Sequence, residues 1–473
     1  MVIGRAKEQQ ELINLLTAGE PQFCAVYGRR RVGKTYLIRE TFSHKFTFQH
    51  TGLANAGKGD QLREFRESLR LAGMKKVSIP HTWYEAFHLL EEYLSLLPKG
   101  KKLIFIDELS WMDTPHSNFI SALEHFWNGW VTARKEKDII LIVCGSATSW
   151  IINKVINNHG GLHNRITKKI YLQPFTLREC EEYSKGLHLQ LGRKEIAELY
   201  MVLGGVPYYW SFLRKDESAT QAVDRLFFAE DAPLGNEFNS LYASLYKNAE
   251  PHIAIINALS AKKSGMQRNE ILRVTKMSDN STFGKALEEL EQCSFIRRYY
   301  SIGKKERNAV YQLMDNLTLF HNQFIKTNVR HDVRFWSHSR GTSLYHTWSG
   351  LAFERLVLWH LPQVTKALGI NGIATSAHSW SQKGDDSMEG AQIDLLIDRN
   401  DNTINICEIK YAKEEYRISK EENERMLRHV MLLREATKTR KSIHLTLISP
   451  FGAVRNEYWN DIQSEVGLDD LFA

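Results

Sequence analysis

Short apolar runs alternate with helical patterns over the first 173 residues of the chain. Continuous apolar runs occupy residues 23–27, 103–106 and 139–144. Runs without polar interruption are typical of strands that a parallel sheet buries on both faces. Two further strands are expected near residues 46–51 and 169–172. Because helical stretches separate these runs, the pattern predicts an α/β core with a five-stranded parallel sheet.

Residues 174–248 have a mostly helical pattern. Apolar positions recur at spacings of three and four in residues 179–183 and 195–203, as on one face of a helix. Residues 219–234 indicate further packing helices. We therefore expect a helical segment after the sheet, which we interpret as a lid.

From Pro251 onward the pattern changes to short helices followed by strands. The predicted helices are one marked by Ile253, Ile256 and Leu259, then residues 268–274 and 281–293. Residues 295–300 and 309–313 predict a hairpin whose turn contains Gly303, Lys304 and Lys305. This order predicts a winged-helix domain over residues 249–330, a fold that commonly contacts DNA.

The predicted hairpin carries basic side chains that could contact nucleic-acid phosphates. They are Arg297, Arg298, Lys304, Lys305 and Arg307. The third predicted helix, the candidate recognition helix, begins at Ser281 and is only mildly basic. The hairpin is therefore the more basic part of this domain.

The last third of the chain, residues 331–473, predicts a second α/β domain. Residues 350–357 form an amphipathic helical pattern, and a polar, glycine-bearing loop is expected from 381 to 390. Two strands are predicted at residues 392–398 and 404–410, joined by the turn-forming residues 399–402. A charged helix is predicted at 414–440. Its charged residues form a solvated face or, alternatively, its basic residues line a groove beside a nucleic-acid phosphate.

These two strands predict a small charged cluster. Side chains alternate faces along a strand, so Glu408 and Lys410 lie on the same face. If the turn centres near Asp401, Asp394 lies directly across from Glu408, and a one-residue slip in register would separate them. Two carboxylates and an ammonium suit Mg²⁺ or Mn²⁺ and an attacking water. The alternative is a surface acid–lysine pair on an edge hairpin.

Composition narrows these interpretations only a little. A length of 473 residues suggests about three domains, and 43% hydrophobic and 25% charged residues are ordinary for a globular protein. The net charge of +7 allows contact with nucleic acid without requiring it.

The cysteines and the lengths of the apolar runs indicate the cellular compartment in which the protein is expected. The five cysteines lack a C-x-x-C spacing, and three lie in apolar stretches, which predicts small core residues in a reducing compartment. The chain begins directly on foldable sequence without a signal peptide, and no apolar run reaches about 18–20 residues. We therefore expect a cytoplasmic protein with no membrane partner.

The first predicted strand leads into a nucleotide-binding loop. The loop pattern G-x-x-x-x-G-K-[ST] is matched by Gly28, Arg29, Arg30, Arg31, Val32, Gly33, Lys34 and Thr35. The two glycines let the backbone wrap around phosphates. Lys34 would reach the β- and γ-phosphates of ATP, and Thr35 would hold Mg²⁺. For the three arginines we favour a solvated edge over contact with other phosphates.

Polar residues end the next two apolar strands, at the sheet edge where α/β ligands bind. Asp107 would bind Mg²⁺ through water, and Glu108 would orient or deprotonate the attacking water. Ser146 is the first candidate for a side chain that senses the γ-phosphate and transmits its presence to the rest of the fold, and Thr148 is the second. For Asp107 and Glu108, the alternative is that they are acids exposed to solvent at the end of a strand. For Ser146 and Thr148, the alternative is the capped start of a helix.

At this point the chain resembles the archaeal and bacterial P-loop ATPases of the extended AAA-type class. Besides the loop, the matching residues are Ile3-Gly4-Arg5 with Glu8, Asp107-Glu108, Cys144-Gly145-Ser146, Asn164-Arg165-Ile166 before Pro174-Phe175, and Gly204-Gly205-Val206-Pro207-Tyr208. The resemblance implies an ATPase that often continues into a winged helix, frequently structural or regulatory, and a nuclease-like domain.

The resemblance also implies a role for Arg165. In such families an arginine after the fourth strand acts on the γ-phosphate, and Arg165 is the matching residue. Asn164 stands where family members usually have glycine, and a structural salt bridge is the competing account. An arginine that acts across subunits would imply a homo-oligomer. The Gly-Gly-x-Pro turn resembles the lid motif of the family.

The predicted charged cluster in residues 331–473, which we call the rear cluster, resembles the site of the PD-(D/E)xK nuclease superfamily. The matching residues are Glu354, Asp394, Glu408 and Lys410. Gln392 would add a polar contact, and Ile393 stands where proline is expected. The resemblance implies a nuclease-like domain with Glu354, Asp394 and Glu408 as metal ligands.

Together these patterns predict an ATP-hydrolysing, AAA-type switch coupled to a nuclease-like domain that acts on DNA. The predicted domains are an ATPase core (1–173), a lid (174–248), a winged helix (249–330) and a nuclease-like domain (331–473). The alternative is a non-cleaving regulatory ATPase with an inactive rear domain. The sequence does not distinguish a DNA substrate from RNA.

Overall fold

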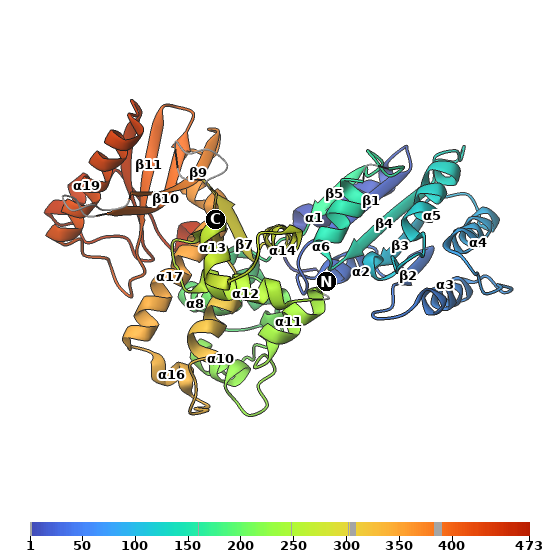
Figure 1. The fold of residues 1–473 in the computed structure, drawn as a ribbon, viewed down its shortest axis with the longest axis horizontal. Coiled ribbons are helices and arrows are strands. Elements are labelled where there is room, and N and C mark those ends of the chain that lie inside the picture. Colours follow the sequence, from blue (N-terminus) through green and yellow to red (C-terminus); the bar gives the residue numbers. More distant parts are fainter. Residues whose placement is uncertain (1, 159, 247, 301, 303–308, 383–389) are drawn as a thin grey trace. The chain divides into compact units, whose positions relative to one another are not determined.

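The computed structural model describes residues 2–158, 160–246, 248–300, 302, 309–382 and 390–473. The chain divides into two compact units, Met1–Pro174 and Phe175–Ala473 (Figure 1). Among the described residues, no helix has both the length and the apolar character that crossing a membrane requires.

A five-stranded parallel sheet forms the centre of the first unit. Its strands are β1 (Gln22–Tyr27), β2 (Phe48–Thr51), β3 (Lys102–Asp107), β4 (Ile139–Gly145) and β5 (Lys168–Tyr171). They lie in the order β2-β3-β4-β1-β5, and every neighbouring pair is parallel. The predicted α/β fold with a five-stranded parallel sheet is therefore confirmed.

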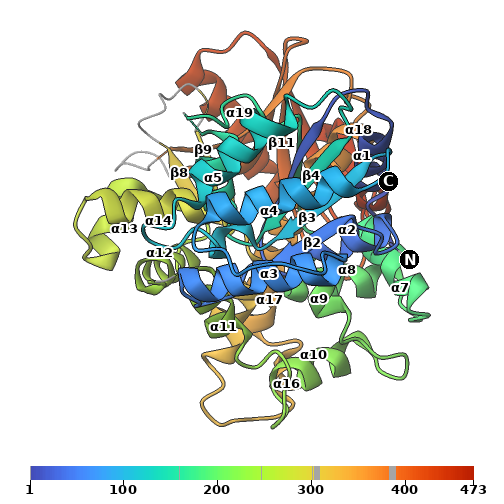
Figure 2. The ribbon, with the colours of Figure 1, turned by 90° about the vertical axis from the view of Figure 1, so that its right-hand side faces the viewer.

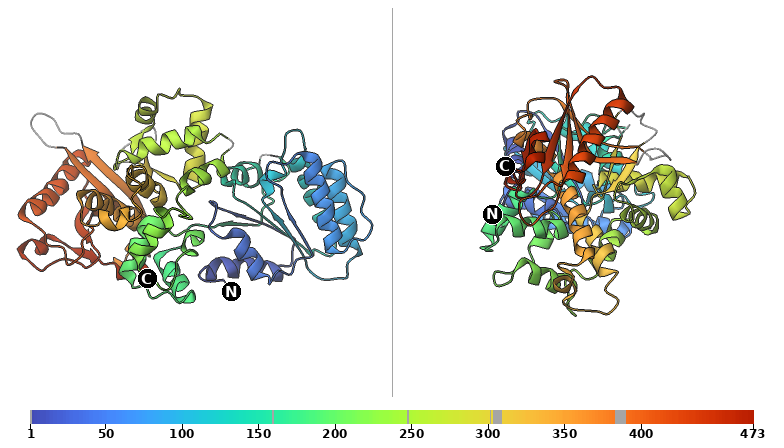
Figure 3. Two further views of the ribbon diagram at one scale, coloured as in Figure 1. Left: turned by 90° about the horizontal axis from the view of Figure 1, so that it is seen from below. Right: turned by 90° about the vertical axis from the view of Figure 1, so that its left-hand side faces the viewer.

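Alternate residues of these strands supply two separate cores. Phe23 and Ala25 of β1 pack on one face, whereas Cys24 and Val26 pack on the other. Helices α3, α4 and α5 cover the first face, and α1 and α2 cover the second (Figures 2 and 3). Burial on both faces explains why the strands have uninterrupted apolar sequences.

The helices of the first unit follow the expected alternation with strands. The α-helices are α1 (Ala6–Thr17), α2 (Lys34–Thr41), α3 (Lys58–Ala72), α4 (Trp83–Leu96), α5 (Phe119–His125) and α6 (Thr148–Trp150). The 3₁₀ helix η1 (Leu109–Trp111) and the π-helices η2 (Phe126–Val131) and η3 (Ile151–Ile156) accompany them.

The second unit is richer in helices. They are α7 (Leu177–Gly186), α8 (Arg193–Leu203), α9 (Pro207–Trp210), α10 (Ala219–Phe227), α11 (Glu237–Leu245), α12 (Glu250–Ser260), α13 (Arg268–Thr275), α14 (Ser281–Gln292), α15 (Asn316–Phe320), α16 (Phe335–Ser339), α17 (Ser343–Trp359), α18 (Leu361–Ala367), α19 (Lys420–Thr437), η5 (His321–Ile325), η6 (Glu457–Asp461) and η7 (Asp469–Phe472).

Helices α12, α13 and α14 precede a small antiparallel sheet. Its strands β6 (Met266–Gln267), β7 (Ile296–Tyr299) and β8 (Val310–Leu313) lie in the order β6-β8-β7. These elements share a core that also includes Phe238 and Tyr242 of α11. The predicted hairpin turn, with Gly303, Lys304, Lys305 and Arg307, lies outside the described residues.

A five-stranded mixed sheet occupies the rear of the second unit. Its strands are β9 (Thr375–Gln382), β10 (Ala391–Arg399), β11 (Thr403–Ile409), β12 (Ser442–Ile448) and β13 (Ser464–Val466), in the order β13-β12-β11-β10-β9. Helix α19 covers one face, with Met426 and Leu433 in the core, and α17 covers the other with Phe353 and Leu356.

Two predictions about this region were wrong, and one alternative does not hold. Residues 381 and 382 end strand β9 rather than begin a loop, because the polar sequence of β9 hides its pairing with β10. Helix α19 begins at Lys420, where Ser419 and Glu422 form a capping box, and not at residue 414. Neither β10 nor β11 is an edge strand, so the edge-hairpin alternative does not hold.

Helix α17 is buried more completely than an amphipathic helix would be. Residues 352–358 are all buried, because the helix lies in a core shared by several parts of the second unit. That core joins Tyr200 and Trp210 of the predicted lid to Leu356 of α17 and Leu395 of β10. The helices of the predicted lid and the rear sheet therefore stabilise one another.

Candidate functional site

The phosphate loop lies between β1, which ends at Tyr27, and α2, which begins at Lys34. Gly28 and Gly33 have φ angles of +146° and +90°, in a region that L-residues rarely adopt. A Cβ atom at Gly28 would lie 2.2 Å from the carbonyl oxygen of Leu172. The loop therefore depends on glycine for both backbone conformation and space.

Lys34 is buried and its ammonium points back across the loop. Its Nζ donates hydrogen bonds to the carbonyl oxygens of Gly28 at 2.8 Å and Arg29 at 2.9 Å. The lysine is thus held at the concave side of the loop, where the phosphates of a nucleotide would be surrounded by backbone N–H groups.

Thr35 and Asp107 meet although 72 positions separate them in sequence. The Thr35 hydroxyl donates to Asp107 Oδ2 at 2.8 Å. The other oxygen, Asp107 Oδ1, accepts a hydrogen bond from Cys144 Sγ at 2.8 Å. A hydroxyl and a carboxylate in contact are oxygen donors of the kind that Mg²⁺ prefers, so these residues fit the predicted ion.

Sequence reasoning missed the contribution of Cys144. All five cysteines are buried, which confirms their prediction as core residues. Burial raises the pKa of the Cys144 thiol well above its usual value, and the nearby Asp107 carboxylate raises it further. The thiol therefore keeps its proton and donates a hydrogen bond to Asp107. The sequence places Cys144 at the end of an apolar run, and the pairing of β4 with β3 brings it to Asp107.

Glu108 is positioned by Ser146. Its Oε2 accepts hydrogen bonds from the Ser146 backbone N–H at 3.1 Å and from the Ser146 hydroxyl at 3.0 Å. The runner-up, Thr148, is fully buried, and its hydroxyl has no hydrogen-bond partner among the described residues. The structure therefore brings Ser146, and not Thr148, into contact with the predicted catalytic carboxylate.

The arginines of the loop differ from one another. Arg29 is only 3% exposed, so the prediction of a solvated edge was wrong for this residue. Arg30 and Arg31 are half-buried. Val32 packs beneath the loop in the core formed with α1 and α2.

Arg165 lies on the surface between η3 and β5. Its side chain is exposed, and its backbone N–H donates to the Leu162 carbonyl oxygen at 3.0 Å. Within the part of the chain that the structure describes, Arg165 forms no ion pair, so the structural salt bridge is not observed. Its action on the γ-phosphate stays a prediction.

The Gly204-Gly205 turn lies in the second unit. Gly204 has a φ angle of +59°, and a Cβ atom at Gly205 would lie 1.9 Å from the Phe175 carbonyl oxygen. The Phe175 N–H donates to the Gly205 carbonyl oxygen at 2.6 Å. The turn therefore fastens the start of the unit to the end of α8.

The rear strands have the predicted register. Leu395 pairs with Cys407 and Asp398 with Ile404, which centres the turn on Asp401. Extended by one position, this register aligns Asp394 with Glu408. The predicted polar contact of Gln392 is also present, because its Nε2 donates to Asp394 Oδ1 at 2.6 Å.

Glu354 is held in an ion pair that the sequence did not indicate. The Lys263 ammonium contacts Glu354 Oε1 and lies 3.6 Å from Asp394 Oδ2. Glu354 is 3% exposed, and its burial together with the nearby Asp394 charge raises the pKa of the carboxyl to about 7. Lys263 lies in a polar turn after α12, where nothing local predicts a partner 91 residues away in sequence.

Glu408 also has cationic partners. Its Oε1 lies 3.1 Å from Lys410 Nζ and accepts from Arg425 Nη2 at 2.9 Å. Lys410 Nζ is also 3.6 Å from Glu422 Oε1. Glu408 and Lys410 thus share a face, whereas Arg425 of α19 is a partner that sequence reasoning did not assign.

The three rear carboxylates fit a metal ion in chemistry but not in arrangement. Carboxylate oxygens suit Mg²⁺ or Mn²⁺. In residues 2–473, apart from the gaps named above, no group of three or more His, Cys, Asp or Glu side chains is placed to hold a metal. Each of Glu354, Asp394 and Glu408 instead lies beside a lysine or arginine.

Arg297 does not extend toward solvent from the predicted wing. Its Nε donates to Gln312 Oε1 at 2.6 Å, and its guanidinium lies 4.7 Å from the centre of the Tyr299 ring. Burial and the neighbouring Arg355 charge together lower the pKa of Arg297 to about 10. The predicted phosphate contact of Arg297 therefore does not match this arrangement, whereas Arg298 is exposed and pairs with Glu291.

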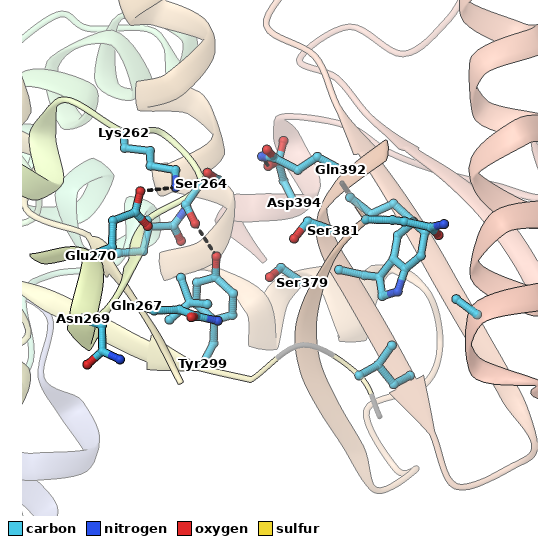
Figure 4. Close-up of a pocket in the computed structure, with 18 of the residues that line it drawn as sticks. Lys262, Ser264, Gln267, Asn269, Glu270, Tyr299, Ser379, Ser381, Gln392 and Asp394 are labelled. Atoms are coloured by element: carbon cyan, nitrogen blue, oxygen red, sulfur yellow. Dashed lines mark hydrogen bonds and ion pairs between the residues drawn. The ribbon is translucent and has the colours of Figure 1, made fainter. Parts of the chain in front are cut away.

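A cavity of about 1040 Å³ lies within the second unit beside Asp394. In Figure 4, Ser264 and Gln267 of the α12–β6 region face Ser379, Ser381 and Asp394 of strands β9 and β10 across it. Hydroxyl, amide and charged groups therefore line a space that reaches one of the predicted rear residues.

Comparison with known proteins identifies a similar family for the first part of the chain. Residues 3–212 match a family model described as an ATPase domain predominantly from Archaea. An uncharacterized protein of Methanocaldococcus jannaschii is 23% identical over 427 residues, covering 87% of this chain and 88% of that protein.

Two solved structures are similar at low sequence identity. The Walker-type ATPase of Pyrococcus abyssi has a TM-score of 0.48 and 15% identity, covering 68% of this chain and 96% of its own. The ORC2 protein of Aeropyrum pernix has a TM-score of 0.44 and 14% identity, covering 72% of this chain and 96% of its own. The family match over residues 3–212 and the intact phosphate loop support a P-loop ATPase in the first part of this chain.

Proposed function

We propose that this protein is an ATP-hydrolysing, AAA-type switch whose second unit acts on DNA. The observation that carries the proposal is the contact of 2.8 Å between the Thr35 hydroxyl and the Asp107 carboxylate, beside Lys34 in the phosphate loop. This contact brings the magnesium-binding groups of two separate motifs together at one edge of a parallel sheet.

The residues of the first unit have distinct roles in this proposal. The Lys34 ammonium would exchange its loop carbonyl partners for the β- and γ-phosphates, and Thr35, with Asp107 through water, would hold Mg²⁺. When bound, Mg²⁺ neutralises charge on the phosphates. Glu108 orients and deprotonates the attacking water, and Ser146 holds the Glu108 carboxylate in place.

ATP hydrolysis by purified variants tests these roles. We expect Lys34→Ala to abolish ATP binding and hydrolysis, because the ammonium is lost from the phosphates. Glu108→Gln should still bind ATP but hydrolyse it about 10²- to 10⁴-fold more slowly. Lys45→Ala, an exposed lysine after α2, serves as the matched control. Unchanged hydrolysis in Lys34→Ala would reject the proposal.

For the second unit we retain the predicted segments as part of the proposal. They are a lid at 174–248, a winged helix at 249–330 and a nuclease-like domain at 331–473. The order of α12, α13, α14 and the β7–β8 pair supports a winged helix that contacts DNA. Nucleotide state would change how this unit meets DNA, and Arg165 would act on the γ-phosphate within one chain or across a homo-oligomer.

A specific observation favours binding of DNA over its cleavage. Glu354 and Asp394 share the ammonium of Lys263, and Glu408 pairs with Arg425. Carboxylates neutralised in this way are not arranged for a catalytic cation. The second candidate function is metal-dependent cleavage, which rests on the alignment of Asp394 with Glu408 and on the position of Lys410.

Cleavage assays distinguish these two functions. Plasmid and single-stranded DNA would be incubated with Mn²⁺ or Mg²⁺, with and without ATP. Cutting that is lost in Glu408→Ala, and kept in the exposed α19 control Glu424→Ala, would establish a nuclease. Loss of that cutting in Lys34→Ala would show coupling to ATP. If no cutting occurs and Asp394→Ala binds DNA normally, the rear domain is a binding domain.

A further inference from the structure

The loop between α12 and β6 places a lysine at the predicted rear site. We propose that the Lys263 ammonium takes the place of a divalent cation between Glu354 and Asp394. The predicted site is then closed to divalent cations as long as this loop stays in position. The inference concerns cation binding alone and does not require that the protein hydrolyse ATP or cut DNA.

The contacts of Lys263 support this substitution. Its Nζ contacts Glu354 Oε1 and lies 3.6 Å from Asp394 Oδ2, so one positive charge serves two carboxylates. The second Glu354 oxygen, Oε2, lies 3.8 Å from Arg355 Nη1 and has no hydrogen-bond partner among the described residues. The ionised form of a buried carboxyl is stabilised by a nearby cation, and here the chain itself supplies that cation.

The backbone of the loop is fixed by the surrounding strands and helix. The Lys263 carbonyl oxygen accepts hydrogen bonds from Arg355 Nη2 of α17 and Gln312 Nε2 of β8, each at 2.8 Å. The Tyr299 hydroxyl donates to the Ser264 carbonyl oxygen at 2.5 Å. Tertiary contacts therefore place the backbone at Lys263, from which its side chain reaches the two carboxylates.

Gly265 allows the loop to approach β8 closely. Its φ angle is +76°, and a Cβ atom there would lie 2.4 Å from the Tyr311 carbonyl oxygen. Substitution of Gly265 should therefore move the loop away from β8 while the charge of Lys263 is kept. A Gly265 variant therefore tests whether the position of the Lys263 ammonium matters when its charge is still present.

The loop can be reached by a ligand. The Lys263 side chain is 49% exposed, and its neighbours Lys262 and Ser264 line the cavity that also contains Asp394 (Figure 4). A ligand in this cavity that displaced the loop would expose both carboxylates. Movement of the α12–β6 loop is therefore the step that would open this site to a metal ion.

Direct measurement of Mn²⁺ binding tests the proposal. Electron paramagnetic resonance would count bound Mn²⁺ on the full chain without nucleotide, and the rear contribution is the part that Asp394→Asn removes. At the Mn²⁺ concentration that half-saturates the rear site of Lys263→Met, the wild type should show almost no rear contribution. Lys263→Met should bind Mn²⁺ at the rear about tenfold or more tightly than the wild type, because two carboxylates lose their cation. Asp394→Asn in the same chain should remove the gain.

Matched variants identify the cause. Lys262→Met removes the neighbouring lysine, which pairs with Glu270 at 2.7 Å, and should leave Mn²⁺ binding as in the wild type. Lys263→Arg keeps a cation and should keep Mn²⁺ out. Gly265→Ala should increase Mn²⁺ binding with Lys263 still present, and this variant decides the question if Lys263→Met does not fold.

Two outcomes would overturn the proposal. One is a wild-type protein that binds Mn²⁺ in a manner lost in Asp394→Asn and unaffected by Lys263→Met. The other is a folded Lys263→Met variant, checked by circular dichroism, in which Mn²⁺ binding at the rear does not increase.

Discussion

At the residue scale, the conformation of the phosphate loop depends on the absence of a Cβ atom at Gly28. Gly28 combines a φ angle of +146° with a backbone so close that a Cβ atom would meet the Leu172 carbonyl oxygen at 2.2 Å. The loop motif predicted glycine here for its backbone freedom. The close approach of Leu172, which follows β5, could be known only from the sheet order that places β5 beside β1.

We expect Gly28→Ala to abolish ATP binding and to lower the free energy of unfolding by at least about 2 kcal/mol, because the new methyl group clashes with fixed backbone. Urea unfolding and the binding of a fluorescent ATP analogue would measure both effects. Gly19→Ala is the control, since a Cβ atom at Gly19 meets nothing within 4 Å. Equal behaviour of the two variants would contradict this account.

A buried histidine should make the stability of the second unit depend on pH. His360 Nε2 accepts a hydrogen bond from the Leu177 N–H at 2.8 Å, and its Nδ1 lies 2.7 Å from the Leu356 carbonyl oxygen. These partners require the neutral ring with its proton on Nδ1. Burial lowers the pKa of His360 to about 4.

Because the folded pKa lies below the ordinary value, the stabilising effect of neutral His360 is present above about pH 6.5 and is lost as pH falls toward about 4. We expect wild-type stability to fall by about 2 kcal/mol relative to His360→Gln between about pH 7.5 and pH 5. Urea unfolding at both pH values would measure this difference. Parallel pH curves for the two proteins would show that the prediction is wrong.

At the scale of elements, α17 connects the parts of the second unit. Its residues 352–358 are all buried, and Arg355 donates to the carbonyl oxygens of Leu313 and Lys263. Helix α17 thus carries the rear carboxylate Glu354 and also fastens the loop that neutralises it. An apolar pattern on one helix could not indicate this, because both partners belong to other segments.

Two glycines in this unit should respond in opposite directions to alanine. Gly350→Ala in α17 should raise the free energy of unfolding by about 0.5–1 kcal/mol, because its Cβ atom meets nothing within 4 Å and helical glycine costs entropy. Gly205→Ala should lower it by more than about 2 kcal/mol, because its Cβ atom would lie 1.9 Å from the Phe175 carbonyl oxygen. Thermal and urea unfolding would measure both changes, and a loss of stability in Gly350→Ala would contradict the description of α17.

At the scale of the whole molecule, the cores define which segments can fold alone. Both cores of the first unit use residues up to Leu172 only. One core of the second unit instead joins Phe175 near its beginning to Phe472 near its end. Stability in this unit therefore depends on contacts between segments that are far apart in sequence.

Fragments test this division. We expect residues 1–174 to unfold cooperatively and to gain thermal stability from ATP, because ligand binding to the folded state shifts the unfolding equilibrium. The same fragment with Lys34→Ala should show no gain. In a fragment of residues 1–330, the segment after residue 174 should be cut rapidly by protease, since α17 and the rear sheet are missing from its core. Protease resistance of that segment would contradict the shared core.

The sequence by itself determined the features that depend on local spacing. The buried strands of the parallel sheet, the phosphate loop and the pair Asp107–Glu108 follow from residues that are adjacent in the chain. The sequence also offered the alignment of Asp394 with Glu408, conditional on a turn centred near Asp401, and the structure has that register.

Only the tertiary structure decided which distant groups meet. The thiol of Cys144 on Asp107, the ammonium of Lys263 between Glu354 and Asp394, and the pairing of polar strand β9 have no local signal. Local periodicity reports which face of an element is buried but not which partner covers it. A buried charge must be neutralised by whichever cation the packing brings within reach, and packing is a property of the whole fold.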